Sequence, residues 1–251
     1  MLPFTRVAPS TQDQAIPIAH ADVHVWAFIL RESNATVEAW RELLSDDEKL
    51  RADRFVRRRD RARWIVAHGV LRHALGRYCG VEPRAIAFVQ GVAGKPSLAQ
   101  AGAHGVTTTF NLAHSHDRAL LAVSRDREIG VDLEQVRDDF DPLPIAREFF
   151  FGTELAAIQA AAPELRREAF FRHWTAKEAV LKAHGAGLSL ALDSFCVTFE
   201  AGGSIARVRS RGPAALDPAL LVRMLPLPAG WHGAVAASGE DWTLEPEQRD
   251  N

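Results

Sequence analysis

The stretch His173-Trp-Thr-Ala-Lys-Glu-Ala-Val-Leu-Lys182 matches Arg63-Trp-Ile-Val-Ala-His-Gly-Val-Leu-Arg72 at a constant offset of 110 residues. Both stretches read as helix, and each is followed by a glycine-containing break, a strand and, later, a strand of small residues. The predicted strands span 84–90 and 118–124 in the first half and 194–200 and 233–238 in the second. The matching order of the elements predicts two related halves.

This repeat sets the fold class that we expect. Strands that alternate with helices and return to one sheet fit an α+β half whose sheet packs on one long helix. We therefore predict two similar, pseudo-repeated subdomains, each with a small, mainly antiparallel sheet. We place the boundary near 125–127, which gives an N-terminal subdomain of residues 1–125 and a C-terminal subdomain of residues 126–251. Clefts between domains are favoured ligand sites, so we expect the functional site between the halves.

Three residues of the second helix share one face. Trp174, Glu178 and Lys182 lie at positions i, i+4 and i+8, which places a carboxylate and an ammonium group one turn apart beside an aromatic ring. Two interpretations are open. The charged residues form a surface pair, worth only about 0.2–0.5 kcal/mol to the helix, or they belong to an active site.

An acidic strand is predicted upstream, at Ile129-Gly-Val-Asp-Leu-Glu134. Its apolar residues, at every second position, point into a core, so Asp132 and Glu134 point together to the other face. Two adjacent carboxylates on one face repel each other unless a cation lies between them. Mg²⁺ takes oxygen ligands and is typically held by one or two carboxylates and substrate phosphates. The alternative is a half-solvated strand with an ordinary polar face.

Two further segments point to phosphate. Gly94-Lys95-Pro96 is a turn that carries a lysine, although a plain surface turn would look the same. The run 107–115 is rich in strand formers and leads into a second strand, 118–124. The polar residues at this hairpin loop or strand end are Asn111, His114, Ser115, His116 and Asp117. Adjacent residues of an extended segment point apart, so a nucleophilic pair of Ser115 and His114 is disfavoured.

A basic stretch lies in the first half. Its eight cations within fifteen positions are Lys49, Arg51, Arg54, Arg57, Arg58, Arg59, Arg61 and Arg63. Arginine binds phosphate through bidentate hydrogen bonds, whereas the alternative is a solvated helix whose aliphatic stems cover the core. The first helix has Ala67 and His68 where the second has Lys177 and Glu178, and we find no equivalent of the acidic strand in the first half. We therefore expect anion-binding cations in the first half and the metal in the second.

Composition limits the class of protein. The chain of 251 residues is 47% hydrophobic and 25% charged, which is enough for one large domain or two small ones with cores. It has no apolar run of about 18 residues and no secretory signal pattern at its start. A formal charge of −2 argues against a general nucleic-acid binder. Cys79 and Cys196 are far apart and form no metal-binding motif, so we expect a cytoplasmic protein with reduced thiols.

Taken together, GKP, FNLAHS, IGVDLE and FFRHWTAKEAVLKAHGAGL, in this order within residues 94–188, closely resemble the motifs of the 4′-phosphopantetheinyl transferases of the surfactin-synthetase-activating (Sfp-like) type. The resemblance implies transfer of the phosphopantetheine arm of coenzyme A to a serine of an acyl, peptidyl or aryl carrier protein, with release of 3′,5′-ADP. It also implies a monomer with pseudo-twofold symmetry. The alternatives are a metal-dependent phosphohydrolase that needs no protein acceptor and a non-catalytic polyanion-binding protein.

The resemblance also implies roles for individual residues. Mg²⁺, for which Mn²⁺ would substitute, is held by Asp132, Glu134 and Glu178. Glu178 takes the proton from the carrier serine, directly or through a water on the metal, and Lys182 reaches the pyrophosphate or the leaving group. The residues expected to contact coenzyme A are Arg51, Arg63, Lys95, His114 and Lys182. The family often has serine at the position of Ala113, so we expect weaker binding of coenzyme A at most, without loss of activity.

One acidic residue remains open between two interpretations. Glu154 resembles the end of a further family stretch and would then support the metal or the base. It equally fits the acidic first turn of a helix that starts near Thr153, and we prefer this second interpretation because the local signal is complete. The three phenylalanines at 149–151 are expected to be core residues, with any exposed one facing the carrier protein.

Overall fold

The computed structural model of the chain describes residues 1–9, 14–91, 94–99, 107–185, 190–210, 216–217 and 219–247. The last residues of the longest motif, 186–188, lie outside this part of the chain. The rest of the predicted motifs can be placed.

The order of the elements repeats along the chain. The first half contains β1 (Asp22–Ile29), α1 (Asn34–Glu42), α2 (Asp46–Asp53), α3 (Arg58–Cys79), β2 (Phe88–Gln90), β3 (Pro96–Leu98), β4 (Thr108–Ser115) and β5 (Arg118–Arg125). The second half contains β6 (Ile129–Gln135), α4 (Pro142–Phe149), α5 (Gly152–Ala160), α6 (Arg166–His184), β7 (Phe195–Phe199), β8 (Ile205–Ser210), β9 (Leu220–Met224) and β10 (Trp231–Ser238). Short 3-10 helices span Pro83–Ala85, Pro163–Leu165 and Leu192–Ser194. A last strand, β11 (Thr243–Pro246), follows both halves.

The strands form two main sheets and a hairpin. The first sheet has the order β11-β1-β5-β4, the second has the order β6-β10-β9-β8-β7, and β2 pairs with β3. β1 pairs antiparallel with β5 in the way that β6 pairs antiparallel with β10. We expected no counterpart of the acidic strand in the first half, but β1 occupies the place that corresponds to β6. The sequence of β1, DVHVWAFI, nevertheless lacks the alternating carboxylates of β6.

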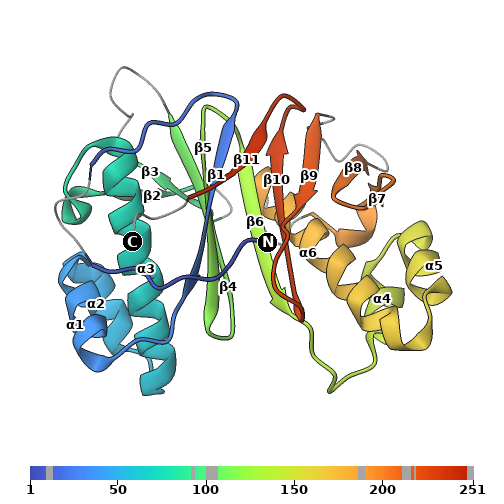
Figure 1. Cartoon of the computed structure of the whole chain (residues 1–251), viewed down its shortest axis with the longest axis horizontal. Helices are drawn as coiled ribbons and strands as arrows, with labels where there is room; N and C mark the ends of the chain where they lie inside the picture. Colours follow the sequence, from blue (N-terminus) through green and yellow to red (C-terminus); the bar gives the residue numbers. More distant parts are fainter. Residues whose placement is uncertain are drawn as a thin grey trace.

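The two sheets pack face to face between the two long helices, α3 and α6 (Figure 1). One apolar cluster joins α3 to the first sheet through residues such as Val70 and Phe28, and another joins α6 to the second sheet through residues such as Val180 and Val222. Between the sheets, Val25 packs with residues such as Val131 and Val235. The predicted α+β fold, with a long helix on each sheet, is confirmed. The division at residue 125 stays a prediction.

The predicted helices and strands differ from the observed ones mainly at their ends. Both long helices end at a glycine in the left-handed conformation, Gly80 with φ 67° and Gly185 with φ 74°. The strand expected at 84–90 begins only at Phe88, because the residues before it form a 3-10 helix. The carbonyl oxygens of Pro83 and Ile86 accept hydrogen bonds from the buried Arg72 guanidinium, so this turn is fastened to α3.

A single glycine controls how closely α6 approaches the acidic strand. A Cβ atom on Gly130 would lie 2.1 Å from the carbonyl oxygen of Ala179 and 2.3 Å from the nitrogen of Ala183. No side chain fits there, so glycine lets the strand lie directly on the helix backbone. This close packing brings the carboxylates of β6 within reach of the charged residues of α6.

Candidate active site

The three predicted metal ligands come from two elements that face each other. Asp132 and Glu134 project from β6, and Glu178 projects from α6. Lys182, one turn further along α6, donates from Nζ to Asp132 Oδ1 at 2.6 Å. Burial raises the pKa of Asp132, and the Lys182 ammonium group opposes this shift. Burial and the nearby Asp132 carboxylate raise the pKa of both Glu134 and Glu178, so the three carboxylates share one electrostatic environment.

The charges of this group suit a divalent cation. Asp132 is 6% exposed, and its Oδ2 atom is buried without a hydrogen-bond partner among the described residues. Three carboxylates and one ammonium group leave a net charge of about −2 if all are ionised, which Mg²⁺ would neutralise. In the conformation observed, however, no three His, Cys, Asp or Glu side chains of the described segments are placed so that they could hold a metal ion. Ligation by all three carboxylates therefore requires side-chain movement, and Mg²⁺ stays a prediction.

A cavity in the first half contains one of the predicted phosphate-binding cations. A cavity of about 230 Å³ is lined by residues of α3 and β4, among them Arg63, Trp64 and His114. The imidazole of His114 has an exposed edge. Nevertheless, partial desolvation in the cavity and the positive charges of Lys182, His68 and Arg63 lower the pKa of His114. His114 thus lies within electrostatic reach of Arg63 from the first half and of Lys182 from the second.

Two of the residues predicted to contact coenzyme A, Arg51 and Lys95, do not line this cavity. Arg51 is exposed, and its guanidinium carbon is 5.7 Å from the centre of the Trp64 ring, at the edge of the cavity. The Lys95 ammonium group donates to Glu128 at 2.9 Å and to the carbonyl oxygens of Ile129 and Ala183 at 3.0 and 3.2 Å. These three bonds use all of its donors. In this conformation Lys95 fastens β6 to the end of α6, and its phosphate contact stays a prediction.

The two faces of β4 have different surroundings. His114 faces the cavity, whereas Ala113 is 4% exposed and belongs to the apolar cluster between the sheets. A hydroxyl group at position 113 would therefore lie in an apolar layer rather than beside the cavity. The weaker nucleotide binding that we expected from Ala113 has no support in this geometry.

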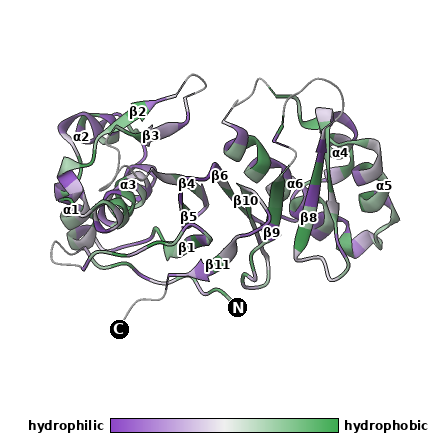
Figure 2. Ribbon diagram, turned by 90° about the horizontal axis from the view of Figure 1, so that it is seen from above, coloured by the Kyte–Doolittle hydropathy of each residue, from purple (hydrophilic) through white to green (hydrophobic). Residues whose placement is uncertain are grey.

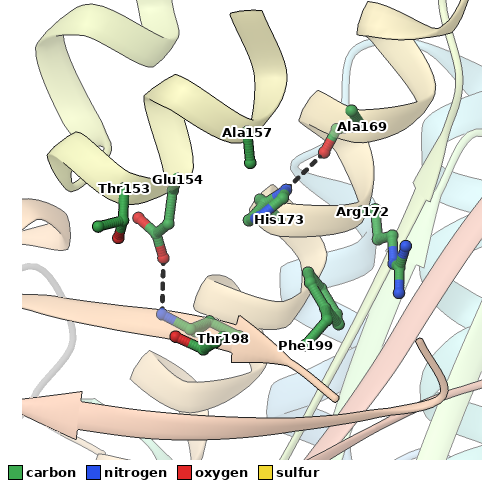
Figure 3. A pocket seen from close by; sticks show the side chains of 9 residues that line it. Thr153, Glu154, Ala157, Ala169, Arg172, His173, Thr198 and Phe199 are labelled. Atoms are coloured by element: carbon green, nitrogen blue, oxygen red, sulfur yellow. Dashed lines mark hydrogen bonds between the residues drawn. The ribbon is translucent and has the colours of Figure 1, made fainter. Parts of the chain in front are cut away.

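Glu154 is part of a buried ion pair of the fold. Its carboxylate accepts hydrogen bonds from Lys177 Nζ at 2.6 Å, from the Phe151 N–H at 2.9 Å and from the Val197 N–H at 2.7 Å. Lys177 is fully buried and also donates to the carbonyl oxygen of Phe195. Figure 3 shows Glu154 at the start of α5, close to β7. The interpretation of Glu154 as the acid of a helix start is thus confirmed.

The first half contains a matching arrangement. Glu48 closes the capping box of α2 with Ser45 and pairs with the buried Arg72 of α3. Glu154 occupies the corresponding place in α5 and pairs with a cation of α6. In both halves a glutamate at a helix start neutralises a buried cation of the long helix. The two cations occupy different positions of the repeat, because Arg72 aligns with Lys182 and Lys177 aligns with Ala67.

Replacing Glu154 with glutamine should strongly destabilise the fold. The variant leaves the Lys177 ammonium group buried without its counter-charge, and breaking a buried pair in this way costs about 3–5 kcal/mol. For a chain of this size, the melting temperature should fall by about 6–20 °C. The measurement is urea and thermal unfolding followed by circular dichroism.

The matched control is the same substitution in an exposed ion pair. Glu200 pairs with Arg207 at 2.8 Å, with both side chains more than 40% exposed. Such pairs contribute at most about 1 kcal/mol, so the Glu200→Gln variant should unfold close to the parent. Equal unfolding midpoints for the two variants would contradict the structural role of Glu154.

A second cavity, of about 370 Å³, lies away from the carboxylates. It is enclosed by α5, α6 and β7, with Arg172, His173 and Phe199 among its lining residues (Figure 3). His173 binds the carbonyl oxygen of Ala169 within its own helix, and burial lowers the pKa of its imidazole. Of the predicted site residues that the structure describes, only Glu154, now assigned to the fold, lines this cavity.

The sequence interpretation missed contacts that support the site. Ser115 Oγ donates to Glu134 Oε2 at 3.0 Å, and Asn111 Oδ1 accepts from the Val131 N–H at 2.9 Å. The alternation of FNLAHS was a usable signal, because it places Asn111 and Ser115 on one face. The expectation of three core phenylalanines is confirmed for Phe150, which is buried. It is wrong for Phe149, which is 39% exposed at the end of α4, and for Phe151, which is only half-buried. Among the described residues, no helix is long and apolar enough to cross a membrane.

Comparison with known proteins gives the family. A family profile described as the 4′-phosphopantetheinyl transferase superfamily matches residues 128–224, and one described as 4′-phosphopantetheinyl transferase, N-terminal, matches residues 31–126. The chain is 39% identical over 168 residues to the 4′-phosphopantetheinyl transferase HetI of Nostoc sp., which covers 67% of this chain and 70% of the relative. It is 28% identical over 169 residues to the 4′-phosphopantetheinyl transferase Sfp of Bacillus subtilis, which covers 67% and 72%.

These matches confirm the resemblance that the four motifs indicated. They fall on both halves of the chain and include Arg63, His114, Asp132, Glu134, Glu178 and Lys182. Residues 1–30, with β1, and residues 225–251, with β10 and β11, lie outside them. The chain therefore belongs to the 4′-phosphopantetheinyl transferase superfamily and is an enzyme of its Sfp-like type.

Proposed function

We propose that the chain transfers the 4′-phosphopantetheine arm of coenzyme A to a serine of an apo carrier protein and releases 3′,5′-ADP, in a reaction that depends on Mg²⁺. The observation that carries this proposal is the meeting of opposite charges at the junction of the halves. Asp132, Glu134 and Glu178 influence one another electrostatically, Lys182 pairs with Asp132, and the charges of both Lys182 and Arg63 reach His114. A pyrophosphate with its metal needs both kinds of group.

The second half would supply the metal ligands and the proton acceptor. Asp132, Glu134 and Glu178 would hold Mg²⁺, which when bound would neutralise the charge that develops on the pyrophosphate. Lys182, which pairs with Asp132 in this conformation, would turn its ammonium group towards the leaving ADP oxygen. Glu178 is half-buried, and its carboxylate would accept the proton of the carrier serine. The remaining contribution is positioning, as in other phosphoryl transfers.

The decisive test combines the purified protein with coenzyme A, Mg²⁺ and an apo carrier domain, and reads the carrier by intact mass. The expected result is a carrier heavier by one phosphopantetheinyl group, together with 3′,5′-ADP. Cleavage of coenzyme A without a carrier would instead favour a phosphohydrolase. Coenzyme A that stays intact both with and without the carrier would favour a non-catalytic binding protein.

The first half should bind the nucleotide through Arg63. Replacing Arg63 with alanine removes a charged hydrogen-bond donor from the cavity, which costs about 1.5–3 kcal/mol per bond. We expect coenzyme A to bind about 10–150-fold more weakly, as measured by calorimetry. If Arg63 contacts the 3′-phosphate, dephospho-coenzyme A should bind the variant and the parent nearly alike.

Arg58 offers a control within the same basic stretch. It is exposed at the first turn of α3, and it does not line the cavity. The Arg58→Ala variant should keep the affinity of the parent for both ligands. Equal losses for coenzyme A and dephospho-coenzyme A in the Arg63 variant would assign Arg63 another role.

Two finer expectations accompany the proposed reaction. Because both halves of the site come from one chain, we expect a monomer, with a mass near 27.6 kDa by light scattering. A cytoplasmic location stays a prediction, which fractionation of the source cells would check. The two cysteines, Cys79 and Cys196, are both free thiols, as expected for a reducing compartment.

A further inference from the structure

The strands β4 and β6 belong to different sheets, yet they lie side by side at the junction of the halves (Figures 1 and 2). Side chains of β4 bind the backbone of β6. The Val131 N–H donates to Asn111 Oδ1 at 2.9 Å, and the Gln135 N–H donates to Ser115 Oγ at 3.4 Å. Both pairs are separated by 20 residues, so the two strands run in the same direction with one register.

Ser115 makes a further contact from this position. Its Oγ atom donates to Glu134 Oε2 at 3.0 Å, which is closer than its 3.4 Å contact with His116 Nδ1. Ser115 is 8% exposed, so water competes little for this bond. The Oε2 atom of Glu134 is thereby held by Ser115, and the Oε1 atom remains available for another ligand.

We infer that Ser115 is a positioning residue for Glu134, and that Asn111 fixes the strand register on which this contact depends. The inference rests on the proposed role of Glu134 as a metal ligand. The Asp132 carboxylate repels Glu134, so without a restraint the longer glutamate side chain would swing towards solvent. A hydroxyl group that donates to one carboxylate oxygen holds the side chain in place before the metal arrives, and carboxylate ligands are commonly fixed in this way.

The test is a measurement of metal binding with coenzyme A present. Mn²⁺ is the probe, and its free concentration is read by electron paramagnetic resonance. Loss of an outer hydrogen-bond partner of a metal ligand usually weakens binding by about 10–100-fold, so Ser115→Ala should bind Mn²⁺ more weakly by that factor. Ser115→Thr keeps the hydroxyl group and should restore most of the affinity.

Thr109 provides the matched control on the same strand. Its Oγ1 atom donates to the carbonyl oxygen of Arg127 at 2.6 Å, at the far end of the junction between β4 and β6. Thr109→Val removes a hydroxyl group that contacts Arg127 and Ser124 rather than a carboxylate, and it keeps the shape of the side chain. It should leave the affinity for Mn²⁺ unchanged. Ser115→Cys, with its weak donor, replaces Ser115→Ala if that variant does not fold.

The outcomes separate this inference from the proposed function. Weaker binding in Ser115→Ala but not in Thr109→Val supports the positioning role. Parent-like affinity in Ser115→Ala, or equal losses in both variants, overturns that role and leaves the proposed metal site intact. If the parent itself binds no Mn²⁺ in the presence of coenzyme A, the metal site and the inference built on it both fall.

Discussion

Replacing Asp132 with alanine should abolish transfer to the carrier protein. Asp132 is the most deeply buried of the three carboxylates, and its Oδ2 atom lacks a partner among the described residues. The variant therefore removes the predicted ligand that is least accessible to water. A bound metal contributes several kcal/mol of charge stabilisation, so we expect a loss of at least about 10³-fold at saturating Mg²⁺.

The companion variant Asp132→Asn separates charge from shape. It keeps the volume of the side chain and removes one negative charge, so it should lose activity as alanine does. Both variants should remain folded, because Lys182, the partner of Asp132, is 30% exposed and can be solvated. Circular dichroism checks the fold, and intact carrier mass checks the transfer. Near-normal turnover of either variant would remove Asp132 from the metal site.

Replacing Glu178 with glutamine should lower transfer by about 10²–10⁴-fold, the usual contribution of a positioned general base. The substitution keeps the shape and the helix propensity of the residue. It removes the proton acceptor and one of the negative charges that surround Lys182. If Glu178 were only a member of a surface pair, the variant would cost a few tenths of a kcal/mol in stability and leave turnover unchanged.

Glu168 is the matched control for this variant. It lies in the first turn of the same helix and pairs with His232 at 2.6 Å, outside the group of carboxylates. Glu168→Gln should transfer like the parent. Lys182→Met should also lower turnover, and its effect should not add to that of Glu178→Gln, because both residues act on one transition state. Turnover of Glu178→Gln within about threefold of the parent would assign this helix face to the surface.

Local patterns in the sequence predicted much of the fold. The repeated tryptophan motif gave both long helices, and the alternation of Ile129 to Glu134 gave the buried and the acidic face of β6. These signals are local because helix and strand periodicities lie within a few neighbouring residues. The terminal strand β11 was missed, since its partner β1 lies more than two hundred residues earlier and no local pattern reports such a pairing.

The sequence groups the candidate site residues by type but does not give their geometry. The sequence identified Asp132, Glu134 and Glu178 as one group, and their mutual electrostatic influence agrees with that grouping. It could not indicate that Lys95 would bind backbone carbonyl oxygens, or that Lys177 would be fully buried. Both facts depend on which segments pack together, and a lysine in a turn or a helix has the same local sequence signal whether it is exposed or enclosed.

The N-terminal residues contact the second half of the fold, and the C-terminal strand pairs with the first half. The backbone N–H of Leu2 donates to the carbonyl oxygen of Pro226 at 2.7 Å, while β11 pairs in parallel with β1. The halves are therefore interlocked, and a chain that stopped before Thr243 would leave β1 at the border of its sheet. Its unpaired N–H and C=O groups, flanked by buried residues such as Val23 and Val25, would offer a template for another chain. The last strand thus covers an edge that would otherwise promote aggregation, and it also completes the sheet. Shortened versions of this enzyme should therefore retain it.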